Sequence, residues 1–194
     1  MLERLAGVSR MGFLDDCPSI LSSHYIGCAI MKTLLVMRHA ESSWDMHGLQ
    51  DHDRPLNPHG IRDGTRIGRL LVKANFVPVR IFSSTAVRTL STTELVVREF
   101  GTDVEVQSTR ALYLASPHTY VEVLKEMGGE DNPIMVVGHN PGVSALVTVL
   151  SGECKEMATG ALAAIELDID NWSDIQGGEG GRLIDFWRPR DLHD

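Results

Sequence analysis

Three short, mainly apolar segments limit what this chain can fold into, and Arg80 is the one charged residue within them. They cover residues 33–37, 79–82 and 133–137. A continuous apolar run of this length, unlike an alternating one, is typical of a strand buried on both faces. Such strands occur in parallel sheets whose two faces are covered by helices. The runs therefore predict a central, largely parallel sheet.

Segments with helical signals separate these runs. Asn57-Pro58 places a capping residue before a proline at the first helical position, and helical spacing continues to about residue 74. Further helices are predicted at 86–99, from Ser116-Pro117 onward, and from Asn140-Pro141 to about residue 150. Weaker strands are predicted at 104–106, 161–168 and 182–188. This alternation, without an internal repeat, predicts a single layered α/β domain.

Composition excludes several classes of function. The net charge of −8 argues against a nucleic-acid or anionic-membrane binder, because both need clustered Lys and Arg. No apolar stretch reaches the roughly 18–20 residues that a membrane helix needs. The three cysteines are too few for a disulfide framework or a Cys-based metal site, which favours a cytoplasmic location. Nothing in the sequence indicates the oligomeric state.

Residues 1–30 are expected to stand apart from this domain. Charged residues and a proline occupy the place where a signal peptide would have its apolar core. We expect an N-terminal extension that is either disordered or an artefact of start-site assignment. The domain is then expected to span residues 31–194, beginning at Met31.

Arginine or histidine residues follow closely after each of the three apolar segments. Arg38-His39 follows the first, Ser83-Ser84 with Arg88 the second, and Gly138-His139-Asn140 the third. Because the carboxyl ends of parallel strands open onto one edge of a sheet, these side chains should meet in a single crevice. The sequence therefore predicts two imidazoles and two guanidiniums around one ligand.

These residue types suit the binding and transfer of a phosphoryl group. Guanidinium groups offer a planar fork of donors and stay charged at any working pH. An imidazole can attack phosphorus only when it is neutral, and neighbouring positive charges lower its pKa. We expect Arg38 and Arg88 to keep His39 unprotonated near neutral pH and to attract a phosphate dianion. His139 precedes a predicted helix N-terminus and is expected to hold a phosphate oxygen opposite Arg38.

Four ordered sequence blocks carry a family resemblance. Residues 35–42 (LVMRHAES) resemble the Arg-His signature of the histidine phosphatase superfamily. Residues 53–57 (DRPLN), followed by Gly60, are similar to the second motif of its small SixA-type phosphohistidine phosphatase branch. Residues 84–89 and 137–141 are similar to the third and fourth blocks in order and approximate spacing. The resemblance covers about residues 32–188.

The resemblance implies both a fold and a mechanism. The fold would be a three-layer α/β/α sandwich with a mostly parallel sheet, like that of phosphoglycerate mutases. His39 would form a phosphohistidine intermediate that water then hydrolyses. Arg38, Arg88 and His139 would bind the phosphoryl group, with Arg54 as a further ligand. The family needs no metal or organic cofactor.

The sequence departs from the family pattern in ways that affect the expected site. Thr85 stands where relatives often have proline, and Ser91 where a Gln or Glu is common. Larger relatives take a general acid from an insert after the second strand, but here that stretch is short and offers only Asp103 and Glu105. Glu41, Asp45 and Asp53 are the remaining candidates for the acid, each with a structural or solvated role as the simpler alternative. An open site without a lid would fit a phosphorylated protein side chain.

Other readings remain open or fail on spacing. No cysteine has an arginine six residues later, no Asp-x-Asp-x-Thr/Val motif follows a strand, and no P-loop is present. His47, Asp51, His52 and Asp53 could be drawn as a metal site, although a solvated polar loop is the favoured interpretation. The alternatives to a phosphohistidine phosphatase are a phosphatase or mutase acting on small sugar phosphates, and a phosphate-binding module without turnover.

Overall fold

The computed structural model describes residues 31–45, 48–178 and 180–192, so the predicted extension 1–30 lies outside the described residues. Within this part, six strands form one sheet in the order β3-β2-β4-β1-β5-β6. The strands are β1 (Lys32–Arg38), β2 (Arg80–Ser84), β3 (Glu105–Thr109), β4 (Ile134–Gly138), β5 (Leu162–Leu167) and β6 (Gly181–Trp187). The helices are α1 (Pro58–Lys73), α2 (Val87–Arg98), α3 (Pro117–Met127) and α4 (Gly142–Ser151). Short 3-10 turns occur at η1 (Asp51–Asp53), η2 (Arg110–Leu112), η3 (Trp172–Asp174) and η4 (Pro189–Asp191).

The sheet is mostly parallel, as predicted. β1 pairs in parallel with β4, β4 with β2, and β2 with β3. β5 pairs antiparallel with β1, and β6 antiparallel with β5. Among the described strands, β5 alone therefore runs against the rest.

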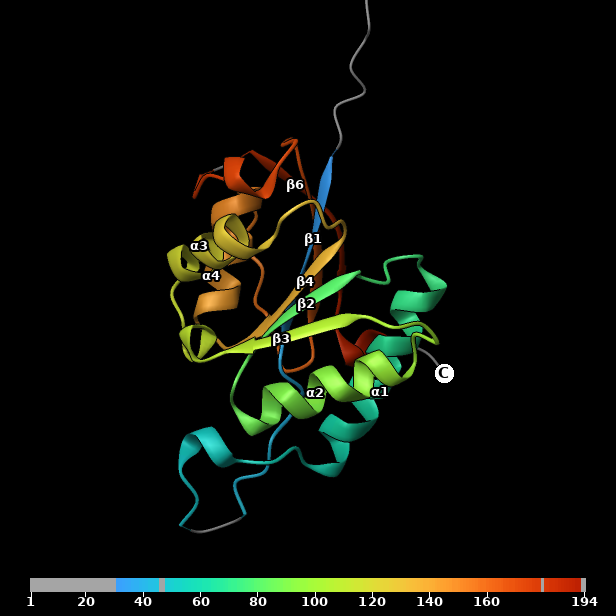
Figure 1. Cartoon of the computed structure of the whole chain (residues 1–194). Helices are drawn as coiled ribbons and strands as arrows, with labels where there is room; N and C mark the ends of the chain where they lie inside the picture. The colour runs from blue at the N-terminus through green and yellow to red at the C-terminus, as the bar shows by residue number, and fades with distance from the viewer. Residues whose placement is uncertain (1–30, 46–47, 179, 193–194) are drawn as a thin grey trace, which may run out of the picture.

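Helices cover both faces of the sheet and make the predicted three layers (Figure 1). Along β1, Leu34 and Val36 belong to the apolar cluster that includes residues of α3 and α4. Leu35 and Met37 belong to the opposite cluster, with residues of α1 and α2. Both faces of β1 are thus buried, which explains why its sequence is apolar without alternation.

Two of the predicted helix starts are confirmed in detail, and a third differs. The side chain of Asn57 accepts a hydrogen bond from the Gly60 amide (2.8 Å), and Ser116 caps α3 in the same way. α4 was expected to open at Asn140-Pro141 but begins at Gly142, with no side-chain cap. The Oδ1 of Asn140, the atom that would cap the helix, accepts instead from the Ser144 hydroxyl (2.8 Å). Its Nδ2 donates to the Met157 carbonyl oxygen (2.9 Å), which ties the segment after β4 to the segment before β5.

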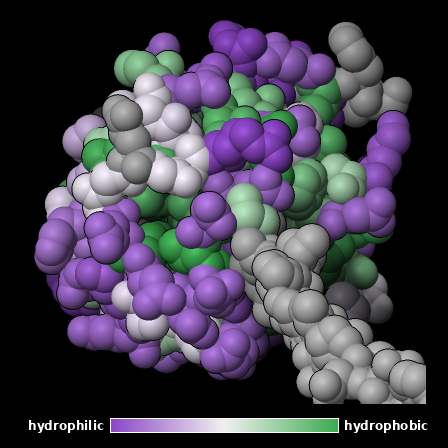
Figure 2. Space-filling model, turned by 90° about the horizontal axis from the view of Figure 1, so that it is seen from above, coloured by the Kyte–Doolittle hydropathy of each residue, from purple (hydrophilic) through white to green (hydrophobic). Residues whose placement is uncertain are grey.

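The end of the molecule from which β1 starts is mainly hydrophilic, with hydrophobic residues set between the hydrophilic ones (Figure 2). No helix in the described part of the chain is long and apolar enough to cross a membrane.

Candidate active site

Two neighbouring central strands bring the two predicted histidines together. Arg38 at the end of β1 lies opposite Gly138 at the end of β4, so His39 and His139 leave the sheet side by side. The His39 amide donates to the Gly138 carbonyl oxygen (3.1 Å), and the two imidazole centroids are 5.2 Å apart. Arg88 reaches the same place from the first turn of α2, directly after β2. These side chains line a cavity of about 370 Å³.

His39 is neutral, with an available lone pair on Nε2. Its Nδ1 lies 2.8 Å from the carbonyl oxygen of Ala40, and its Nε2 lies 3.3 Å from Nε of Arg88. Because a guanidinium can only donate, Nε2 accepts and the ring proton sits on Nδ1, which donates to Ala40. Burial of the ring, reinforced by the charges of Arg88 and Arg38, lowers the pKa of His39 to about 4.

His139 is also neutral, with the opposite arrangement of its ring proton. Its Nδ1 accepts from Nη2 of Arg88 (3.2 Å), so Nε2 carries the proton and donates to Oγ of Ser84 (2.8 Å). Burial and the nearby Arg88 lower its pKa to about 3. His139 can therefore act as a hydrogen-bond donor in its neutral form.

Arg88 is the central donor of the site. It is buried, and its Nε and Nη2 contact the two imidazoles. Its Nη1 donates to the Asp51 carbonyl oxygen, and Nη2 also donates to the Asp51 carboxylate (2.9 Å). One side chain thus joins both histidines to the loop that contains η1.

Arg38 has one donor that meets no acceptor among the residues that the structure describes. Its Nη1 donates to the Met157 carbonyl oxygen (2.9 Å), whereas its Nε is buried without a hydrogen-bond partner. A buried unpaired donor is costly unless it meets an acceptor. Arg38 also lines the cavity, so a small shift of its guanidinium would bring this Nε to an oxyanion bound there.

Arg54 lines the cavity, but its donors are turned to the protein. They reach the Ser43 carbonyl oxygen (3.0 Å), the Ser42 hydroxyl (2.9 Å) and the Asp51 carboxylate (3.1 Å). The exposed ring of Trp44 lies over its guanidinium carbon at 3.2 Å. The contacts of Arg54 thus fold the loop between β1 and α1 over the site.

Comparison with known proteins identifies the family. The model of the histidine phosphatase superfamily (branch 1) matches residues 34–112. An uncharacterised protein of Mycobacterium tuberculosis (strain ATCC 25618 / H37Rv) is 34% identical over 166 residues, which span 79% of this chain and 100% of that protein. A structure described as the phosphohistidine phosphatase SixA from Agrobacterium tumefaciens has a TM-score of 0.70 and 29% identity, covering 81% of this chain and 98% of that one. The chain belongs to the histidine phosphatase superfamily. Its resemblance to SixA places it in the SixA-like branch.

The fold is shared more widely in the histidine phosphatase superfamily. The mycobacterial glucosyl-3-phosphoglycerate phosphatase has a TM-score of 0.56 at 16% identity, covering 79% of this chain and 97% of that one. At this identity the likeness concerns the fold alone. It extends the predicted phosphoglycerate mutase-like architecture to proteins with different substrates.

The histidine phosphatase cavity has two carboxylates in its lining, and only one of them is expected from the sequence. Glu41 lines the cavity, whereas Asp45 and Asp53 do not. The other lining carboxylate is Asp51, which nothing in the sequence distinguishes from its neighbours in a polar loop. Glu105 pairs with Arg80 at the amino end of the sheet, away from His39.

The structure does not support a metal site in the part of the chain that it describes. No three His, Cys, Asp or Glu side chains gather there as metal ligands would. His47 lies outside the described residues. Asp51 contacts guanidinium groups, and His52 contacts Asp53 and Thr85.

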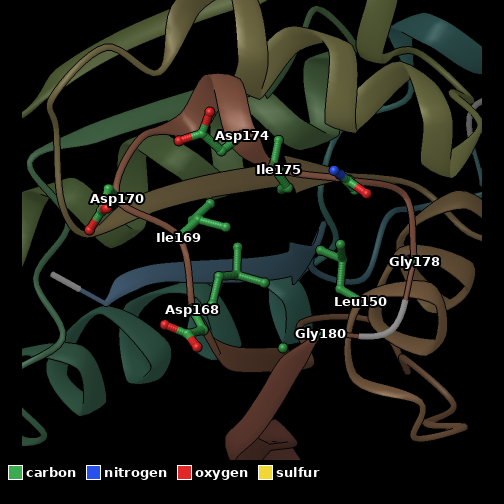
Figure 3. A pocket seen from close by; sticks show the side chains of 11 residues that line it. Leu150, Asp168, Ile169, Asp170, Asp174, Ile175, Gly178 and Gly180 are labelled. Carbon is green, nitrogen blue, oxygen red and sulfur yellow. The ribbon is translucent and has the colours of Figure 1, made fainter. Parts of the chain in front are cut away.

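A second hollow of about 460 Å³ lies at the other end of the sheet, near the start of β1. Apolar side chains such as Leu150, Ile169 and Ile175 line it (Figure 3). Its charged lining residues are carboxylates: Asp168, Asp170 and Asp174. Their charge would repel a phosphate, whereas the cavity beside His39 is lined by Arg38, Arg54 and Arg88.

Proposed function

We propose that this protein is a phosphatase that acts through a phosphohistidine at His39, with phosphohistidine on a protein as its substrate. The observation that carries the proposal is the unprotonated Nε2 of His39 among the guanidiniums of Arg38, Arg88 and Arg54. A neutral imidazole is nucleophilic, and the surrounding cations favour the charge that spreads over the phosphoryl oxygens.

The transfer would proceed in two steps. Nε2 of His39 attacks phosphorus, the bond from phosphorus to the leaving atom breaks, and the leaving atom keeps the electron pair and takes a proton from solvent water. Water then attacks phosphorus, the bond to Nε2 breaks, and phosphate is released. Because Arg88 Nε donates to the attacking lone pair, this donor must shift to a phosphoryl oxygen before attack.

Arg38 and His139 would complete the phosphate-binding shell. The unpaired Nε of Arg38 supplies one donor to the phosphoryl group. The Nε2 proton of His139 becomes a second donor when it turns from Ser84. Arg54 would contribute mainly its positive charge, because its contacts are made to Ser42, Ser43 and Asp51.

The mouth of the cavity favours a protein side chain as substrate. Trp44 and Leu114 line the cavity and are exposed, with 76% and 55% of their surface open to solvent. Only residues 99–104 separate α2 from β3, so no insert in this connection covers the site. An open mouth with apolar residues can accept a side chain presented by another protein.

Trapping the intermediate tests this proposal. Rapid acid-free quenching after mixing with a peptide carrying labelled phosphohistidine should place the label on His39. His39→Ala should abolish label transfer and turnover, whereas His118→Ala, a change on the exposed surface of α3, should retain both. Binding of the phosphopeptide without turnover by the wild type would instead support a phosphate-binding module.

Substrate profiling separates the remaining alternatives. The wild type should have a higher kcat/KM for phosphohistidine peptides than for sugar phosphates or phosphoglycerate. The opposite order would identify a small-molecule phosphatase. Transfer of the phosphoryl group between hydroxyls of one sugar would identify a mutase.

A further inference from the structure

We propose that Asp51 is a positioning residue that holds the Arg88 guanidinium against the two histidines. The contact uses two separate groups of Asp51. Its carbonyl oxygen accepts from Nη1 of Arg88, and its carboxylate accepts from Nη2 at 2.9 Å. Two acceptors on one residue restrict the plane of a guanidinium more than a single one does.

In this plane the guanidinium of Arg88 contacts both histidines. With Nη1 and Nη2 held by Asp51, Nε faces Nε2 of His39 and Nη2 also reaches Nδ1 of His139. A rotation of the guanidinium would break both imidazole contacts together. Asp51 acts through Arg88, because none of its hydrogen bonds in the described part of the chain reaches either imidazole.

Asp51 is itself held by Arg54 of its own loop and by Tyr113, which follows η2. Its carboxylate accepts from Nη1 of Arg54 (3.1 Å) and from the hydroxyl of Tyr113 (2.8 Å). Although partial burial favours the neutral acid, the hydrogen bonds from Tyr113 and Arg54 and the charge of Arg88 lower the pKa of Asp51 to about 2. The carboxylate is therefore ionised at neutral pH.

The burial of Arg88 distinguishes this ion pair from an ordinary surface pair. Exposed pairs contribute little because water screens them and the side chains are free to move. The Asp51 side chain is 45% exposed, but that of Arg88 is only 3% exposed. Removing the partner of a buried guanidinium leaves unpaired donors inside the protein, so Arg88 should lose its orientation.

The same contacts could instead mean that Asp51 competes with phosphate for Arg88. The Asp51 carboxylate could occupy Arg88 donors that a phosphate needs, and its negative charge would then weaken phosphate binding. Positioning and competition predict opposite effects of Asp51→Asn on phosphate affinity. The sign of that effect decides between them.

An NMR experiment tests the positioning directly and needs no turnover. In protein labelled with ¹⁵N-arginine, the Nε–H signal of Arg88, assigned by its loss in Arg88→Lys, should be protected from exchange with water. Asp51→Asn should broaden or abolish this signal, and Asp51→Glu should partly restore it. Asp53→Asn is the matched control, because Asp53 lies in the same turn and its carboxylate contacts His52, with no contact to Arg88 given by the described residues. An unchanged Arg88 signal in Asp51→Asn would overturn the proposal.

Phosphate binding and enzyme kinetics provide a second test of Asp51. The kinetic measurement rests on the proposed function, whereas the binding measurement does not. In Asp51→Asn, kcat/KM should fall roughly ten- to a hundred-fold, less than the roughly 10²–10³-fold loss typical of deleting a donor outright. The Kd for inorganic phosphate should rise in parallel, and Tyr113→Phe should change both in the same direction by less. Tighter phosphate binding in Asp51→Asn would overturn the proposal. Tyr113→Phe also decides the question if Asp51→Asn does not fold, since an unchanged phosphate Kd and Arg88 signal in that variant would refute positioning. If the wild type lacks turnover, the proposed function fails while the NMR and phosphate-binding measurements still test Asp51.

Discussion

The protonation state of His39 follows mainly from its burial. The sequence predicts that neighbouring arginines keep this imidazole neutral. In the structure the largest cause of its lowered pKa is burial of the ring, and the charges of Arg88 and Arg38 add to it. A sequence places arginines near a histidine by motif, but the depth of a side chain is a property of the folded protein. The prediction of a neutral His39 is thus supported for a different leading reason.

This difference gives a testable pH dependence. Attack requires neutral His39, and a pKa lowered from 6.5 to about 4 means that the neutral form predominates above about pH 4. The acidic limb of kcat/KM that belongs to His39 should therefore lie near pH 4, well below that of a free imidazole. NMR titration of the His39 Cε1 proton measures the same group without substrate. A midpoint near 6.5 would show that the ring is more hydrated than the structure implies.

Asp51 shows what the sequence does not reveal at the level of single residues. His39, Arg38, Arg88 and His139 stand out because each follows an apolar strand. Asp51 lies in a polar loop beside other carboxylates, and only folding brings it to Arg88, 37 residues along the chain. Its side-chain partners belong to three different segments, so no local spacing indicates its role.

At the level of elements, the sequence predicts where strands and helices occur better than how they are joined. β1, β2 and β4 follow from their apolar runs, and α1 and α3 from their capping residues. The reversed direction of β5 has no such signal, because strand direction depends on the path of the preceding connection. α4 has no side-chain cap because the Oδ1 of Asn140, the atom that would cap it, accepts from the Ser144 hydroxyl.

The first turn of α1 couples this helix to the site. A Cβ at Gly60 would lie 2.1 Å from the Glu41 carbonyl oxygen, two residues after His39. Gly60→Ala should destabilise the protein by about 1–3 kcal/mol, as overpacking does, and should lower kcat/KM by displacing the backbone beside His39. Thermal or denaturant unfolding gives the first value and steady-state kinetics the second.

Gly177→Ala is the matched control for this change. No atom lies within 4 Å of a Cβ built at Gly177, so the substitution should alter the free energy of unfolding by at most about 0.5 kcal/mol. Equal stability of the two variants would mean that α1 can move away from Glu41 at little cost.

For the whole molecule, the buried histidines link folding to pH. His39 and His139 have folded pKa values of about 4 and 3, below the unfolded value near 6.5. Between the folded and the unfolded pKa values, the unfolded chain binds more protons than the folded protein does. The free energy of unfolding therefore increases with pH in this window and decreases as the pH falls. The protein should therefore be less stable at pH 4.5 than at pH 7.5.

Denaturant unfolding at the two pH values measures this effect. A His39→Asn, His139→Asn double variant that folds should lose less stability between pH 7.5 and pH 4.5 than the wild type does. An equal loss in both proteins would assign the acid sensitivity to other groups.

The pairing of Arg38 with Gly138 has a consequence for how such a protein can diverge. The separation of the two imidazoles is set by hydrogen bonds between β1 and β4 in the middle of the sheet. Buried strands of this kind tolerate few substitutions. Trp44 and Leu114, at the mouth, are carried by connecting segments that tolerate many. Preference for a leaving group can therefore drift from one descendant to the next while the transfer step is preserved.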